Sequence, residues 1–183
     1  KSVLIRSAPG PLVVSDSILS GTQFIPLRKQ YLTAKSIPRR YDGCLNVLIY
    51  LSASPLYSAL ETKIFDCMSN RFGTSQFCFR LMNNFSDATN EFPNPIEAYQ
   101  WADLVIGSCG LSFWERSAMS VPSILYCLTP NQQLVFDYIR NKRLAFFPQS
   151  CFNIDMQSLA NLLLDLSINR FLLRDMSRKV GSY

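Results

Sequence analysis

The chain of 183 residues contains no histidine, and charged residues make up only 17% of it. Without histidine, the chain cannot build Ser-His or Cys-His nucleophilic machinery, bind a metal through imidazole, or use histidine as a general base. Any proton transfer must therefore use a carboxylate, Lys, Tyr or Cys, or a group on another chain or domain.

Cysteine pairs and long apolar runs are also missing. The six cysteines include no C-x-x-C pair, which argues against a zinc ribbon or a thioredoxin-like motif, and we expect no metal site. Small secreted domains carry denser cysteine frameworks, so we expect a reduced, cytoplasmic protein. Apolar runs such as Val47 to Leu51 fall far short of the ~20 residues that span a bilayer, and no signal peptide is visible, so we expect no transmembrane segment.

What is present is the composition of a globular, weakly basic protein. Hydrophobic residues make up 48%, the formal net charge is +5 and the pI is about 9.0. This hydrophobic content argues against intrinsic disorder. Basic and aromatic residues do not interleave as they do in nucleic-acid-binding segments, so we expect no nucleic-acid partner.

Two regions differ in pattern. Residues 1–43 combine short apolar pieces with Gly, Pro and basic residues, and we expect an arm or inter-domain connection there, with short strands. Its basic residues, among them Arg28 and Arg39, could attract an anionic sugar nucleotide or face another domain. Residues 44–183 alternate between apolar, β-branched runs and amphipathic segments, and we expect one domain there.

The alternation predicts strands at 45–51, 76–82, 103–107, 122–127 and 144–147. It predicts helices at 55–70, 96–102, 111–120, 131–141, 155–167 and 169–179, and a polar loop at 83–94. Strands that are apolar on both faces and are each followed by a helix indicate a parallel sheet covered on both sides. With right-handed crossovers, the fold class is α/β, with a Rossmann-like doubly wound parallel sheet and an N-terminal arm.

The segment 102–133 carries the strongest functional signal. A strand ends near Gly107, and Ser108, Cys109 and Gly110 lead into a helix at Leu111. Unpaired amide groups and the positive end of the helix dipole form an anion site there, and Gly110 lets a phosphate approach the backbone. Ser112 can cap the helix or donate a further hydrogen bond, and Glu115 can accept hydrogen bonds from two neighbouring hydroxyls, as on a ribose.

The next strand end adds amide side chains. Asn131 and Gln132 follow Cys127 closely, and such amides suit hydroxyl-rich ligands such as sugars. A second interpretation remains open. Ser108 to Ser112 could be an ordinary capped turn, Glu115 an acid favoured by the helix dipole and Asn131 an N-cap.

The same segment resembles a known family. Residues 102–115 read ADLVIGSCGLSFWE, followed by Pro122 before ILYC and by Asn131-Gln132. This resembles the pattern A-D-L-x-I-G-x-x-G-x-[ST]-x-W-E, then a Pro-led strand and N-Q, of PseG-like UDP-sugar hydrolases of pseudaminic acid biosynthesis. These belong to the MurG-type GT-B superfamily. The segment GTQFIPLRKQY at 21–31 is similar to the family's inter-domain connection, so the resemblance covers about residues 20 to 180.

The resemblance implies the C-terminal, nucleotide-binding half of a GT-B-like enzyme that acts in surface polysaccharide or nonulosonic acid biosynthesis. UDP or a UDP-sugar would be the ligand, with no further cofactor. Gly110, Leu111 and Ser112 would contact the diphosphate and Glu115 the ribose. Ser52, Ser108, Asn131 and Gln132 would lie near the sugar or phosphate. The family's catalytic base is a histidine of the N-terminal domain, so the chain alone would lack the base and be inactive.

One departure from the family supports an alternative. The family's first strand-to-helix loop is rich in glycine, whereas this chain has Ser52-Ala53-Ser54-Pro55. Cβ atoms at these positions narrow the approach of a ligand to the backbone. The alternative is a degenerate GT-B-like domain that acts as a binding or interaction module without catalysis.

Overall fold

The structure, a computed structural model, describes residues 4–6, 18–20, 25–34, 38–39, 41–52, 54–82, 92 and 94–182. In the N-terminal region, β1 (Leu4–Arg6) and β2 (Ile18–Ser20) pair in parallel, and α1 spans Lys29–Thr33. Most of the predicted loop at 83–94 lies outside the described residues.

A parallel four-stranded sheet forms the centre of the domain. Its order is β4 (Phe77–Leu81), β3 (Leu45–Tyr50), β5 (Leu104–Ser108) and β6 (Ser123–Tyr126). The chain adds β4 on one side of β3 and then returns to add β5 on the other side. The strand order therefore reverses between β3 and β5, and in doubly wound folds ligands bind outside the carboxyl ends of the strands at such a point.

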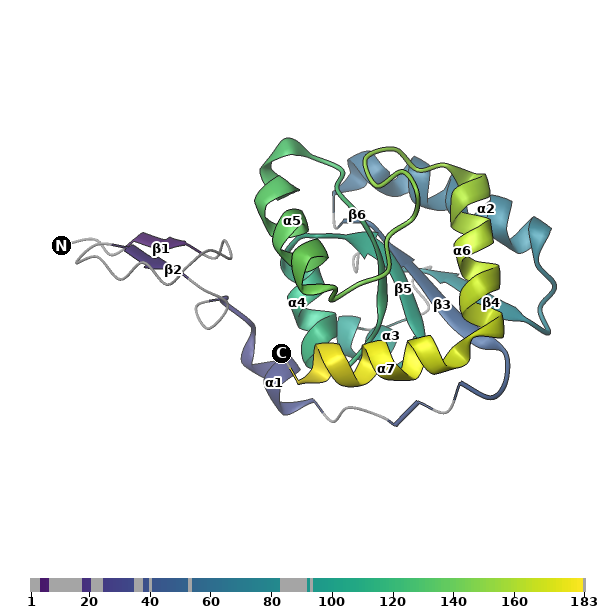
Figure 1. Ribbon diagram of the computed structural model, residues 1–183, viewed down its shortest axis with the longest axis horizontal. Helices are drawn as coiled ribbons and strands as arrows, with labels where there is room; N and C mark the ends of the chain where they lie inside the picture. Colours follow the sequence, from purple (N-terminus) through teal and green to yellow (C-terminus); the bar gives the residue numbers. More distant parts are fainter. Residues whose placement is uncertain are drawn as a thin grey trace.

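Helices cover both faces of the sheet, as the doubly apolar strands require. One face packs against α2 (Ser58–Arg71) and α6 (Met156–Ile168), with α7 (Arg170–Gly181) below them in Figure 1. The other face packs against α3 (Pro95–Trp101), α4 (Leu111–Ala118) and α5 (Gln133–Lys142). The fold is thus the predicted Rossmann-like α/β fold.

Two predicted elements differ in detail. The helix expected from residue 55 begins with a 3-10 turn, η2 (Pro55–Tyr57), and the one expected from residue 131 follows a 3-10 turn, η3 (Pro130–Gln132). The strand expected at 144–147 is reduced to a single bridge between Phe146 and Ile124. Pro148 follows closely and has no N–H to continue the ladder.

Gly107 permits a close approach at the sheet's carboxyl edge. A Cβ at this position would lie 2.9 Å from the carbonyl oxygen of Tyr50 and 3.0 Å from Nη2 of Arg116. Only glycine therefore lets β5 lie against β3 with the Arg116 guanidinium packed beside it.

At the opposite edge of the sheet, Arg170 of α7 lies beside the segment that leads into β3. Its guanidinium donates hydrogen bonds to the carbonyl groups of Tyr41 and Gly43, just before β3. The side chain therefore ties α7 to the start of the sheet. Within the described part of the chain, no helix combines the length and apolar character needed to cross a membrane.

Candidate functional site

A cavity of about 280 Å³ opens at the carboxyl ends of β3 and β5, where the strand order reverses. An adjoining cavity of about 300 Å³ shares three of its lining residues and extends past Asn131. The residues predicted for the site are thus brought together. The first cavity is lined by Arg28, Tyr50, Leu51, Ser52, Ser108, Gly110, Leu111, Ser112, Glu115 and Gln132.

The turn between β5 and α4 lies open to this cavity. Gly110 is the N-cap of α4 and forms no side-chain capping bond, and a Cβ at Gly110 would meet no atom within 4 Å. The first amide groups of a helix have no partner within the helix, so the N–H groups of Leu111 and Ser112 remain available to a ligand. The expectation that Ser112 caps the helix is wrong, because the helix begins one residue before it.

Ser112 instead bonds to Arg116, one turn along α4. Nη1 of Arg116 donates to the Ser112 hydroxyl oxygen at 3.2 Å. Nη2 donates to the carbonyl of Ser108 at 2.9 Å, and Nε donates to the Ser123 hydroxyl at 2.7 Å. The Arg116 side chain is fully buried, and this burial lowers the pKa of its guanidinium below the ordinary value. A single buried cation therefore braces both ends of the turn.

Glu115 lies beside the same turn and is almost fully buried. Its Oε1 accepts a hydrogen bond from Nε of Arg28 at 3.0 Å, and the ion-pair distance from Nη2 of Arg28 to Oε1 is 2.9 Å. No described residue bonds to Oε2, so this oxygen remains available at the cavity.

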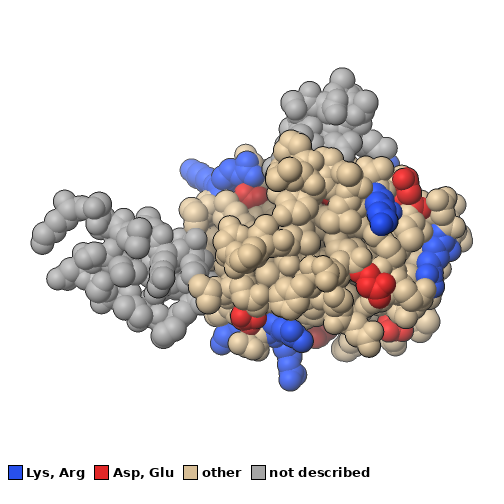
Figure 2. Space-filling model, turned by 90° about the horizontal axis from the view of Figure 1, so that it is seen from above, with Lys and Arg blue, Asp and Glu red and all other residues tan. Residues whose placement is uncertain are grey.

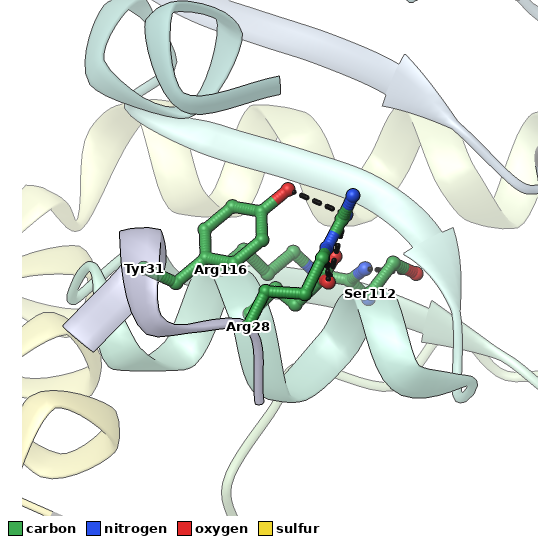
Figure 3. A network of polar contacts seen from close by, with 5 residues as sticks. Arg28, Tyr31, Ser112 and Arg116 are labelled. Atoms are coloured by element: carbon green, nitrogen blue, oxygen red, sulfur yellow. Dashed lines mark hydrogen bonds and ion pairs between the residues drawn. The ribbon is translucent and has the colours of Figure 1, made fainter. Parts of the chain in front are cut away.

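Arg28 reaches the site from the segment before α1. Figure 3 shows Arg28 and Tyr31 lying in front of α4, on which Ser112 and Arg116 sit. Nη2 of Arg28 also donates to the Tyr31 hydroxyl at 2.8 Å. Burial raises the pKa of Tyr31 to about 12, with a smaller contribution from the charge of Glu115. From the sequence, Arg28 was only one of several basic residues of the N-terminal region. The structure places it in the lining of the cavity.

Sequence reasoning missed Glu61. Its carboxylate Oε1 accepts hydrogen bonds from the amide groups of Leu51, at 2.6 Å, and Ser52, at 3.3 Å. Burial raises the pKa of Glu61 to about 7, against the lowering effect of these two bonds. One feature of the sequence could have indicated Glu61. Its spacing places its carboxylate on the same helix face as Ile64 and Met68, which are buried.

The second predicted cluster follows β6. Oε1 of Gln132 accepts a hydrogen bond from the amide of Leu128 at 3.0 Å, and the Thr129 hydroxyl donates to Oδ1 of Asn131. The side-chain N–H groups of Asn131 and Gln132 bond to no described residue, which leaves both as donors at the adjoining cavities. Burial raises the pKa of the neighbouring Cys109 thiol to about 12, so this thiol stays protonated and is a poor nucleophile.

Surface charge adds no large patch on the face seen in Figure 2. Lys and Arg side chains there are interspersed with Asp and Glu over the described residues. The charged residues that line the first cavity are Arg28 and Glu115, and Arg116 bonds to two of its other lining residues, Ser108 and Ser112.

No protein-family model matches the chain, and no curated protein matches it. Among solved structures, MurG of Acinetobacter baumannii matches with 15% sequence identity and a TM-score of 0.66, over 96% of this chain and 55% of that one. The glycotransferase of kitacinnamycin matches with 10% identity and a TM-score of 0.51, over 82% of this chain and 42% of that one. The chain thus spans about half the length of these structures. It shares the fold of GT-B glycosyltransferase domains.

Proposed function

We propose that the chain is a UDP-sugar-binding domain of a nucleotide-sugar hydrolase or glycosyltransferase. The observation that carries the proposal is the cavity at the reversal of strand order, because an open helix N-terminus and a carboxylate line it together. Doubly wound folds bind nucleotides at this place, and helix N-termini bind phosphate.

Different lining residues bind different parts of the ligand. The amides of Gly110, Leu111 and Ser112 bind the diphosphate, and the free Oε2 of Glu115 accepts hydrogen bonds from the ribose hydroxyls. Arg28, 57% of whose side chain is exposed, adds a positive charge at the rim of the cavity. Asn131 and Gln132 donate hydrogen bonds to the sugar or the distal phosphate.

The reaction of the whole enzyme would be hydrolysis or sugar transfer, as in a PseG-like hydrolase or a MurG-type transferase. The bond broken lies either at the anomeric carbon, with UDP as the leaving group, or within the diphosphate. The domain contributes binding and stabilises the charge that develops on the UDP leaving group. In the resembled hydrolase family the base is a histidine of the N-terminal domain, and since this chain has no histidine, the corresponding base would come from a further domain. All six cysteines are free thiols, which favours the reducing cytoplasm as the place of this reaction.

One observation favours the second candidate, a binding module without catalysis. The amides of Leu51 and Ser52, at the end of β3, already bond to the Glu61 carboxylate. A ligand phosphate cannot use these two amides, whereas the glycine-rich loop of the resembled family leaves its backbone open.

A thermal-shift comparison of UDP, UMP and ADP tests the proposal. We expect millimolar UDP to raise the melting temperature more than UMP, because the second phosphate reaches the α4 amides. We expect it to raise the melting temperature more than ADP, because the family that the sequence resembles binds UDP-sugars. An equal response to ADP and UDP would contradict a uridine site. No response to any of the three would favour the interaction module.

A further inference from the structure

The Arg116 guanidinium is a buried charge that forms no ion pair with a carboxylate of the described residues. Its side chain is fully buried, and its three hydrogen-bond acceptors, two serine hydroxyls and one carbonyl, are all neutral. The ion pair found among the described residues joins Arg28 to Glu115 and does not include Arg116. Burying a charge without a counter-charge is costly, and the field of such a charge is screened less in the protein interior than in water.

The position of this charge indicates what it acts on. Arg116 contacts the carbonyl of Ser108 and the hydroxyl of Ser112, the two residues that flank the open N-cap Gly110. The positive end of the α4 dipole lies at the same turn. Both fields therefore favour an anion in the cavity lined by Ser108, Gly110 and Ser112.

Arg116 also determines where the Ser112 proton lies. The Ser112 hydroxyl oxygen accepts the hydrogen bond from Nη1 of Arg116, and no described residue accepts one from Ser112. Arginine has no acceptor, so the hydroxyl proton cannot point back toward it. The proton is left to be donated into the cavity that Ser112 lines.

We propose that Arg116 is a specificity-determining positioning residue, which directs the Ser112 hydroxyl toward a ligand phosphate and makes the cavity selective for the diphosphate over the uncharged nucleoside. This inference rests on the proposed function and deepens it. The charge of Arg116 acts from behind the turn, whereas Arg28 acts from the solvent-exposed rim.

The test compares dissociation constants for UDP and uridine, measured by NMR titration. Arg116→Gln is expected to weaken UDP binding roughly tenfold, the effect of losing one charge-assisted contact, and to change uridine binding less than twofold. Arg116→Lys restores most of the UDP affinity, because it keeps the charge. Arg170→Gln is the matched control. It also removes a positive charge and that charge's hydrogen bonds to backbone carbonyl groups, but it does so at the opposite edge of the sheet.

Ionic strength separates the two arginines. A buried charge is screened little by salt, and an exposed one is screened strongly. Arg116→Gln removes part of the preference for UDP over uridine. The size of that part, measured as the difference between wild type and Arg116→Gln, should therefore stay the same at 0.5 M salt, about three times physiological ionic strength. The part lost in Arg28→Gln should shrink under the same conditions.

Three outcomes overturn the inference while leaving the proposed function in place. In all three, wild type binds UDP. In the first, Arg116→Gln binds UDP as tightly as wild type does; in the second, it binds UDP and uridine more weakly by the same factor; in the third, Arg170→Gln loses as much UDP affinity as Arg116→Gln. If Arg116→Gln does not fold, Ser112→Ala decides. The inference expects a selective loss for UDP in that variant, and an unchanged UDP affinity overturns it. A wild type that binds neither ligand overturns the proposed function itself.

Discussion

Replacing Glu115 by alanine is expected to weaken UDP binding by roughly 10- to 100-fold, which corresponds to the loss of hydrogen bonds between a charged group and the ligand. The reason is that Glu115 lines the cavity with its Oε1 held by Arg28, while no described residue bonds to its Oε2. A carboxylate held in this way is already oriented when the ribose arrives. Calorimetric titration of wild type and variant with UDP measures the effect.

The ribose hydroxyls provide the specific control. Wild type should bind 2′-deoxy-UDP more weakly than UDP, and Glu115→Ala should bind the two equally, because the carboxylate that distinguishes them is gone. Glu97→Ala removes an exposed acid from the first turn of α3 and should leave both affinities unchanged. A Glu115→Ala variant that still prefers UDP over its deoxy form would place the ribose elsewhere.

Replacing Glu61 by glutamine is expected to change how stability depends on pH. Burial raises the pKa of Glu61 from its ordinary value of 4.5 to about 7. Between these values the folded state binds a proton that the unfolded state has released, so Glu61 makes the free energy of unfolding fall as the pH rises. A shift of this size corresponds to roughly 3 kcal/mol, fully lost above the folded pKa.

Urea denaturation of wild type and Glu61→Gln at pH 4, 6 and 8 measures this dependence. We expect the variant to gain stability relative to wild type as the pH rises, because glutamine is buried without a charge and its oxygen can still accept a bond from the Leu51 amide. Two curves that run parallel across this range would show that the Glu61 carboxyl titrates normally.

The sheet and its helices could be predicted because hydrophobic burial dictates them locally. The run from Leu45 and the DLVIG segment are apolar on both faces, and only a doubly covered parallel sheet buries such strands. Element ends were less predictable, since they depend on partners. Whether Phe146 extends a strand or forms one bridge depends on its neighbour in β6 and on the following proline.

The site residues on the turn were found for a similar reason. Gly110 and Glu115 are adjacent in sequence to the end of a predicted strand, so local reasoning reaches them. Arg28 reaches the cavity from the segment before α1, and Glu61 reaches the amides of two of the cavity's lining residues from the buried face of α2, both by tertiary packing. The residues around Arg28 and Glu61 in the sequence do not indicate which strand ends these two side chains will contact in the folded protein. The role of Arg116 depends likewise on Ser123, at the start of β6.

Binding of a diphosphate at the start of α4 is tested by an NMR titration of the wild-type chain with UDP, followed through the backbone amides. We expect the signals of the Gly110, Leu111 and Ser112 amides to shift first and furthest, while those around Arg170, at the opposite edge of the sheet, stay in place. Shifts confined to other parts of the chain, or none at millimolar UDP, would contradict the binding of a diphosphate at the start of α4.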